Sequence, residues 1–203
     1  MKYFDISLTL SPATITWPGD SKFKRIEKKT SAITSRLEMP AHFGTHIDAP
    51  KHFLFNKTSV DKINLQKLIG PAQVFAIRAK NLITKKDIAK IPIKKGGKIL
   101  FKTRNSGLLK KKKFTSNYLS LSLDAAKYLA RKKIDLVGID YFGIEAKSAP
   151  GHPVHKTLLR AGIVIIEGVD LSKVKPGQYN IAALPLKIKA GDGSPARVVL
   201  WRD

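Results

Sequence analysis

Hydrophobic and polar residues follow several different periods along this chain, and most changes of period predict a boundary between elements. Alternating or continuous apolar runs are typical of β-strands with one or two buried faces. Two such runs, residues 23–30 and 32–39, are separated by a single residue and predict a hairpin. The full set of predicted strands is 3–10, 23–30, 32–39, 72–79, 98–102, 134–139, 163–166, 179–186 and 197–201.

Helical periodicity is weaker and confined to short segments. The clearest case is residues 122–132, where Ala125, Ala126, Leu129 and Ala130 share one face. Shorter helices are predicted at residues 61–68, at 155–161, and from a Thr84 cap through Ile91 before Pro92. Residues 104–114 and 141–151 predict loops, the first of them on the surface. There is no internal repeat or linker, so the pattern predicts one domain that mixes α and β structure.

Composition adds limits on the class of protein. The chain has 203 residues, enough to bury a core, and no cysteine, which leaves histidines and carboxylates as the candidate metal ligands. No apolar run reaches the roughly 20 residues that span a bilayer, and the N-terminus does not resemble a signal peptide. We therefore expect a cytoplasmic protein without a membrane partner.

The charge is unusual, because 38 basic and 15 acidic residues leave a net charge of +23. Such a field attracts polyanions. However, the basic residues are scattered, and no zinc finger, RNA-binding signature or basic heptad accompanies them. We expect no specific nucleic-acid partner.

The densest chemistry lies in residues 41–53, AHFGTHIDAPKHF, which hold three of the five histidines and one aspartate. Imidazoles with a carboxylate are the ligands that zinc and related divalent ions prefer. Gly44 and Pro50 oppose a regular helix, whereas an extended segment would turn its even-numbered side chains one way. Gly44 would also allow the backbone to approach an ion closely. The even-numbered candidates are His42, His46, Asp48 and His52.

A second candidate pair lies later in the chain. Glu167 ends the apolar run GIVIIEG, where a strand leaves the core, and a buried carboxylate there needs a cation nearby. His155 precedes it by twelve residues, with a predicted helix between them. From the residues alone, a salt bridge to a lysine remains open for Glu167, and a helix cap or surface position for His155.

The stretch from His42 to Phe53 resembles the H-x-G-T-H-x-D-x-P-x-H-F signature of the cyclase-like metal-dependent hydrolases, which include bacterial kynurenine formamidases and isatin hydrolases. The resemblance continues over nearly the whole chain, in the family's order. It is carried by residues 16–20 (TWPGD), 135–141 (DLVGIDY), 155–159 (HKTLL), 166–171 (IEGVDL), 184–187 (LPLK) and 193–197 (GSPAR).

The resemblance implies a single α+β domain over residues 1–203, with a mixed or barrel-like β-sheet and flanking helices of the swivelling β/β/α type. It implies that His52 is the general acid/base and that Trp17 lines the substrate pocket. It also implies two divalent metal ions, Zn²⁺ in the formamidase pattern, with a single Mn²⁺ as the isatin-hydrolase alternative. The implied metal ligands are His42, His46, Asp48, His155 and Glu167.

This ligand set predicts hydrolysis by metal-activated water, since the chain has neither a cysteine nor a G-x-S-x-G elbow. The substrate implied by the resemblance is N-formylkynurenine, a small aromatic amide, and the assembly is a homodimer or higher homo-oligomer. The alternatives are hydrolysis of another cyclic amide, imide or lactone, and a basic polyanion-binding protein with a structural metal. His152 receives no role. Asp20, Asp140 and Asp192 are candidates either for orienting imidazoles or for capping turns.

Overall fold

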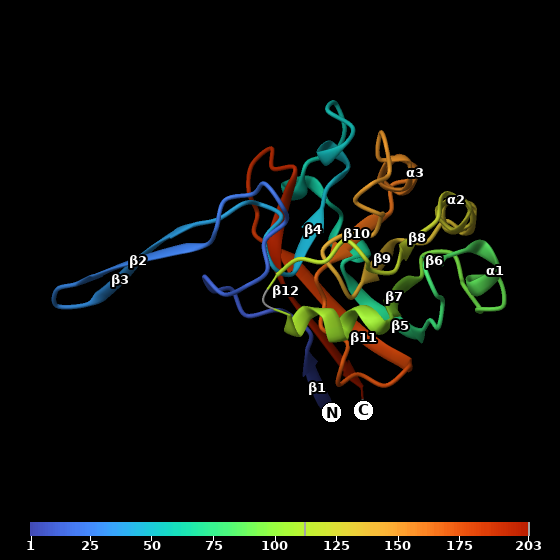
Figure 1. The fold of residues 1–203 in the computed structure, drawn as a ribbon, viewed down its shortest axis with the longest axis horizontal. Helices are drawn as coiled ribbons and strands as arrows, with labels where there is room; N and C mark the ends of the chain where they lie inside the picture. The colour runs from blue at the N-terminus through green and yellow to red at the C-terminus, as the bar shows by residue number, and fades with distance from the viewer. Residues whose placement is uncertain (112, 203) are drawn as a thin grey trace.

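A closed β-barrel forms the body of the molecule in the computed structural model, which describes residues 1–111 and 113–202 (Figure 1). Seven strands pair in the cyclic order β12-β11-β5-β7-β9-β10-β4, with β4 returning to β12, and β1 (Lys2–Asp5) joins the edge of β12. The barrel strands are β4 (His46–Asp48), β5 (Ile69–Ala76), β7 (Lys98–Lys102), β9 (Leu136–Ile139), β10 (Val164–Glu167), β11 (Gly177–Pro185) and β12 (Gly193–Arg202).

Strand directions are mixed around this barrel. The neighbours β5, β7, β9 and β10 run parallel, and β11, β12 and β4 pair antiparallel to their neighbours. The length of β12 allows closure, because residues 193–195 pair with β4 and residues 199–202 pair with β1 on the same edge. The expected α+β fold with a mixed, barrel-like sheet is confirmed.

Two apolar cores lie on opposite faces of the strands, which explains the near-continuous apolar runs in β9 and β10. Leu136 and Ile166 belong to the cluster that fills the barrel, together with residues of β11 and β12. Val137 and Ile165 face the other way, into a cluster shared with the helices. Those helices are α1 (Lys85–Ile88), α2 (Leu123–Lys132) and α3 (Pro153–Arg160).

The helix boundaries follow from local chemistry. Ser122 caps α2 by accepting a hydrogen bond from the backbone N–H of Ala125, and Lys133 ends it in the left-handed conformation. Pro153 occupies the first turn of α3, where its missing N–H costs nothing. Helix α3 thus begins two residues before the predicted start at 155.

The predicted hairpin forms as β2 (Lys24–Lys29) and β3 (Ile33–Glu38), and it projects away from the barrel (Figure 1). All of its strand residues are exposed. A second small sheet pairs β6 (Leu82–Ile83) with β8 (Ser120–Leu121).

Other sequence predictions were wrong in detail. The first strand ends at Asp5 instead of residue 10. Residues 61–68 form two separate 3₁₀ turns, because extended Asn64 accepts from the N–H of Gln66 and interrupts the helix. The helix that Thr84 caps ends at Ile88, before the expected residue 91.

The stretch predicted as a surface loop, 104–114, begins as a 3₁₀ helix, Arg104–Lys110, whose Asn105 and Ser106 are buried. The buried carboxylate of Asp140 accepts hydrogen bonds from the backbone N–H and hydroxyl groups of Thr103 and Ser106. Asp140 therefore caps this segment and does not orient an imidazole. Among the described residues, no helix has the length and apolar character needed to cross a membrane.

Candidate metal centre

Strand register places the central residues of the site. In the antiparallel pair β4–β10, His46 lies opposite Glu167 and Asp48 lies opposite Ile165. Ile47 points into the barrel core, so His46 and Asp48 share the outer face, as their even spacing predicts. The nearest side-chain atoms of His46 and Glu167, Nε2 and Oε2, are 3.5 Å apart. Both residues are almost fully buried.

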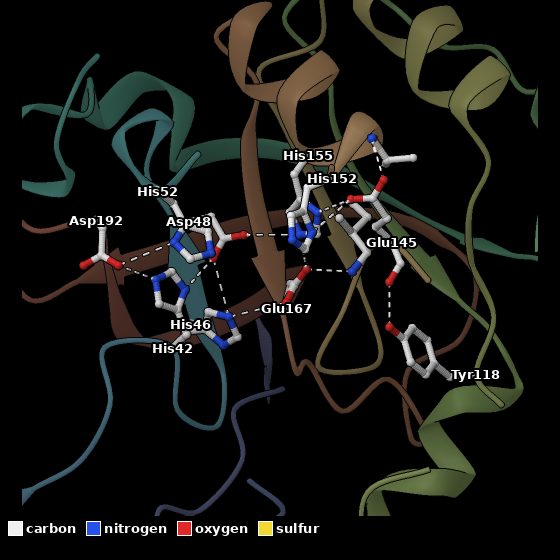
Figure 2. Close-up of polar contacts among 12 residues, drawn as sticks. His42, His46, Asp48, His52, Tyr118, Glu145, His152, His155, Glu167 and Asp192 are labelled. Carbon is white, nitrogen blue, oxygen red and sulfur yellow. Dashed lines mark hydrogen bonds and ion pairs between the residues drawn. The ribbon is translucent and has the colours of Figure 1, made fainter. Parts of the chain in front are cut away.

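His42 is held next to this pair by the start of β12. Its Nδ1 lies 2.8 Å from Oδ1 of Asp48, and its Nε2 lies 2.9 Å from Oδ2 of Asp192 (Figure 2). Gly193 makes room for the ring, because a Cβ there would lie 2.5 Å from Cε1 of His42. Asp192 is therefore an imidazole-orienting residue, the first of the two alternatives that the sequence leaves open.

His46 is oriented by the backbone. Its Nδ1 lies 3.0 Å from the carbonyl oxygen of Gly44, and because a carbonyl only accepts, Nδ1 must donate. Nε2 is then free to bind an ion. Gly44 itself has φ +64°, and a Cβ there would lie 2.5 Å from Cδ2 of Leu10. The glycine is thus required for the left-handed turn and for this close packing.

Helix α3 supplies the remaining histidine. Nε2 of His155 lies 3.2 Å from Oε1 of Glu167 and 3.8 Å from Oδ2 of Asp48. Its Nδ1 lies 2.7 Å from Oε2 of Glu145, a buried residue that no sequence motif indicates. Glu145 falls in a segment predicted as a loop. Its only sequence signal is that it is a single carboxylate between two apolar residues, Ile144 and Ala146.

The spacing of these donors suits a bound cation. Two ligands on a tetrahedral zinc ion, each about 2.0–2.2 Å from the metal, lie about 3.4 Å apart. The five residues named by the resemblance meet at 2.8–3.8 Å. One carboxylate oxygen of Asp48 faces His42 and His46, and the other faces His155. Glu167 likewise turns one oxygen to His46 and the other to His155.

The charges also favour a cation. Burial lowers the pKa of His155, but hydrogen bonds to Glu145 and Glu167 outweigh that effect and raise the pKa to about 10. Burial likewise opposes the carboxylate form of Asp48, yet the hydrogen bond and charge of His42 hold its pKa well below the usual range. The three buried carboxylates thus stabilise positive charge strongly, and a divalent ion would supply that charge directly.

The centre opens to a cavity of about 340 Å³, so it is not the closed site typical of a structural metal. His52 lines this cavity and stacks on His42 with ring centroids 3.9 Å apart. Burial lowers the pKa of His52, and the charge of Asp48 opposes that shift. Trp17 forms one wall of the cavity and packs edge-on against Phe114, with ring centroids 4.9 Å apart. Asp20 and His152 line the same cavity.

The structure therefore brings the five implied metal ligands, His52 and Trp17 together around one cavity. The remaining aromatic wall, Phe53 and Phe142, was not anticipated. Phe53 packs against three histidines. Its ring centroid lies 4.2 Å from that of His52, 4.6 Å from that of His152 and 4.7 Å from that of His155. Phe53 ends the sequence motif, so its place in the signature was the available signal.

Comparison with known proteins agrees with this geometry. The family model described as "Putative cyclase" matches residues 4–146. The kynurenine formamidase of Salinibacter ruber is 34% identical over 98% of this chain and 97% of its own. A solved structure of a predicted metal-dependent hydrolase from Bacillus stearothermophilus is 39% identical, with a TM-score of 0.88, and covers 98% of this chain and 97% of the other.

Isatin hydrolase A from Ralstonia solanacearum has the same fold, with a TM-score of 0.84 over 98% of this chain and 91% of its own, at 22% identity. The match of the family model over most of the chain and the full-length relative lead to one conclusion. The chain belongs to the cyclase family of metal-dependent hydrolases.

Proposed function

We propose that this protein is an arylformamidase that hydrolyses N-formylkynurenine to kynurenine and formate. The observation that carries the proposal is the meeting of five buried or half-buried ligands at the floor of a cavity with aromatic walls. Full-length similarity to a kynurenine formamidase supports the substrate class.

We further propose two neighbouring cation positions, with Zn²⁺ as the ion and Mn²⁺ as the alternative. His42, His46 and Asp48 would hold the first ion, and His155 with the second oxygen of Asp48 would hold the second. Glu167 would bridge the two, because its oxygens face His46 and His155 separately. A divalent ion supplies hydroxide from water at neutral pH and polarises a substrate carbonyl.

The chain's own residues would complete the reaction. Trp17 presents an apolar face at the cavity wall, which suits contact with the aniline ring of the substrate. His52, on the cavity surface beside the centre, would carry the proton that the leaving amine needs. Phe142 and Phe53 narrow the cavity and limit water around the scissile amide.

The direct test combines metal content with turnover. Elemental analysis of protein purified without chelator or metal-affinity tag is expected to give two zinc ions per chain, with hydrolysis of N-formylkynurenine. Two ions without turnover would redirect the search to cyclic amides, imides and lactones, the alternative substrates. No bound metal after reconstitution would contradict the hydrolytic mechanism.

We propose that the protein is a homodimer that uses the projecting hairpin as part of its interface. An isolated two-stranded hairpin is marginally stable in water. Ile33 and Leu37 lie on one face of the hairpin and are 65% and 52% exposed. Leu37 also borders an apolar groove of about 490 Å³ that contains Leu184 and Leu186. A second copy would cover this continuous apolar surface.

Light scattering should report twice the chain mass for the parent protein. Serine at both Ile33 and Leu37 is expected to shift the mass toward the monomer, because it removes the apolar contact. Ile26→Ser is the matched control, since Ile26 lies on the opposite face of the same hairpin. An unchanged mass for the double variant would exclude this face as the interface.

A cytoplasmic location stays a prediction.

A further inference from the structure

The carboxylate of Glu145 has no function in the proposed ligand set, yet it is buried beside it. Its residue is 2% exposed, and its two oxygens serve different partners. Oε1 accepts from the backbone N–H of Val154 at 2.7 Å, and Oε2 lies 2.7 Å from Nδ1 of His155 (Figure 2). Among described residues, the basic side chains within 4 Å of this carboxylate are His155 and the more distant His152, at 3.8 Å.

These two contacts determine how His155 faces the metal centre. A carboxylate accepts hydrogen bonds, so Nδ1 of His155 carries the proton that it donates to Glu145. The lone pair of the neutral ring is then on Nε2, the nitrogen that faces Glu167 and Asp48. The bond from Val154, in the first turn of α3, fixes the same carboxylate against the helix. Ring direction and ring tautomer are therefore set by one side chain.

The backbone of Glu145 is fixed independently of its carboxylate. The hydroxyl of Tyr118 donates to the carbonyl oxygen of Glu145 at 2.6 Å. Removing this hydroxyl would disturb the segment around Glu145 while leaving the carboxylate in place. Such a variant therefore distinguishes a loss of local structure from a specific effect on His155.

Resting on the two-ion function proposed above, we propose that Glu145 is a positioning residue for the second cation. It holds His155 as a ligand through Nε2 and strengthens the ring as a donor by placing a negative charge on the far nitrogen. At the first cation position, Asp192 orients His42 and the carbonyl oxygen of Gly44 orients His46. Loss of Glu145 should therefore weaken one position and leave the other intact.

Glu145→Gln is the decisive variant. The glutamine oxygen can still accept from Val154, so the start of α3 is preserved. Its amide nitrogen would face Nδ1 of His155 and donate to it, which moves the ring proton to Nε2 and blocks the ligand atom. Glu145→Asp is the conservative variant, because it keeps the charge. Tyr118→Phe is the matched control, because it removes the hydrogen bond to the backbone of Glu145 and keeps the carboxylate.

Zinc retained by the loaded protein is to be measured across chelator-buffered free zinc concentrations. The parent is expected to show two positions, and Glu145→Gln to lose affinity at one of them by about 10- to 100-fold. Histidine ¹⁵N spectra of the variant should show the His155 proton moved from Nδ1 to Nε2. Tyr118→Phe should bind zinc like the parent, and Glu145→Asp should recover part of the affinity.

Three results would separate the possible failures. A Glu145→Gln protein that binds zinc like the parent, at both positions, would overturn the positioning function. Equal weakening of both positions with a lower melting temperature, shared by Tyr118→Phe, would overturn it in favour of a structural function. A parent protein that binds neither zinc nor manganese would instead refute the proposed function on which this inference rests.

Discussion

Asp48→Ala is expected to abolish metal binding and reduce hydrolysis to the uncatalysed background. The two oxygens of Asp48 face histidines on opposite sides of the centre, His42 at 2.8 Å and His155 at 3.8 Å. One substitution would thus remove a ligand from both proposed cation positions. It would also remove the carboxylate nearest to His42, at 2.8 Å, which leaves that imidazole with Asp192 alone. Elemental analysis and turnover of N-formylkynurenine measure the two losses.

Asp5→Ala is the matched control, because Asp5 is an exposed aspartate paired with Arg197 and is not among the residues that line the cavity. It should keep the metal content and rate of the parent. Circular dichroism of Asp48→Ala must show a folded chain for the comparison to hold. A folded Asp48→Ala protein with the parent's metal content would refute Asp48 as a bridging ligand.

His52→Ala is expected to lower the turnover number by about 10²- to 10⁴-fold, the range of general acid–base catalysis, and to keep the metal content of the parent. The imidazole lies on the cavity wall, with Nδ1 3.5 Å from Asp192, and would protonate the leaving amine. His52→Gln tests the same point with hydrogen-bonding capacity retained. It should be as slow as the alanine variant, because an amide does not transfer protons at neutral pH.

The structure offers one competing assignment for this residue. Ligand atoms of His52, His42 and Asp48 all lie within 4.8 Å of one another, a spacing that a metal ion can also bridge. If His52→Ala loses one equivalent of metal along with activity, His52 is a ligand and not the acid. Full turnover by His52→Ala would exclude both functions.

The sequence predicted where two of the proposed ligands lie because their positions follow from local geometry. The even spacing of His46 and Asp48 places both on one face of any extended segment, and β4 confirms this. Glu167 follows an apolar run whose end must meet solvent or a cation. In each case the local period carries the information, so no knowledge of neighbouring strands was needed.

The sequence alone did not predict which groups support those ligands. Asp192 reaches His42 because β12 pairs with β4, and Glu145 reaches His155 because the segment before α3 folds back on it. These contacts join distant segments, and periodicity indicates a buried face without naming its neighbour. The helix predicted over 61–68 failed for a local reason, since the side chain of Asn64 competes for the backbone N–H groups.

The short strand β4 has a consequence for folding during synthesis. Its three residues pair with β10 and with the first residues of β12, near the end of the chain. A ribosome adding about 5–20 residues per second would make Pro195 roughly 7–30 s after Asp48. During that interval the nascent chain carries a histidine-rich segment whose two partner strands are not both present. The barrel closes, and the histidines and carboxylates meet, only after residues 193–195 have been made.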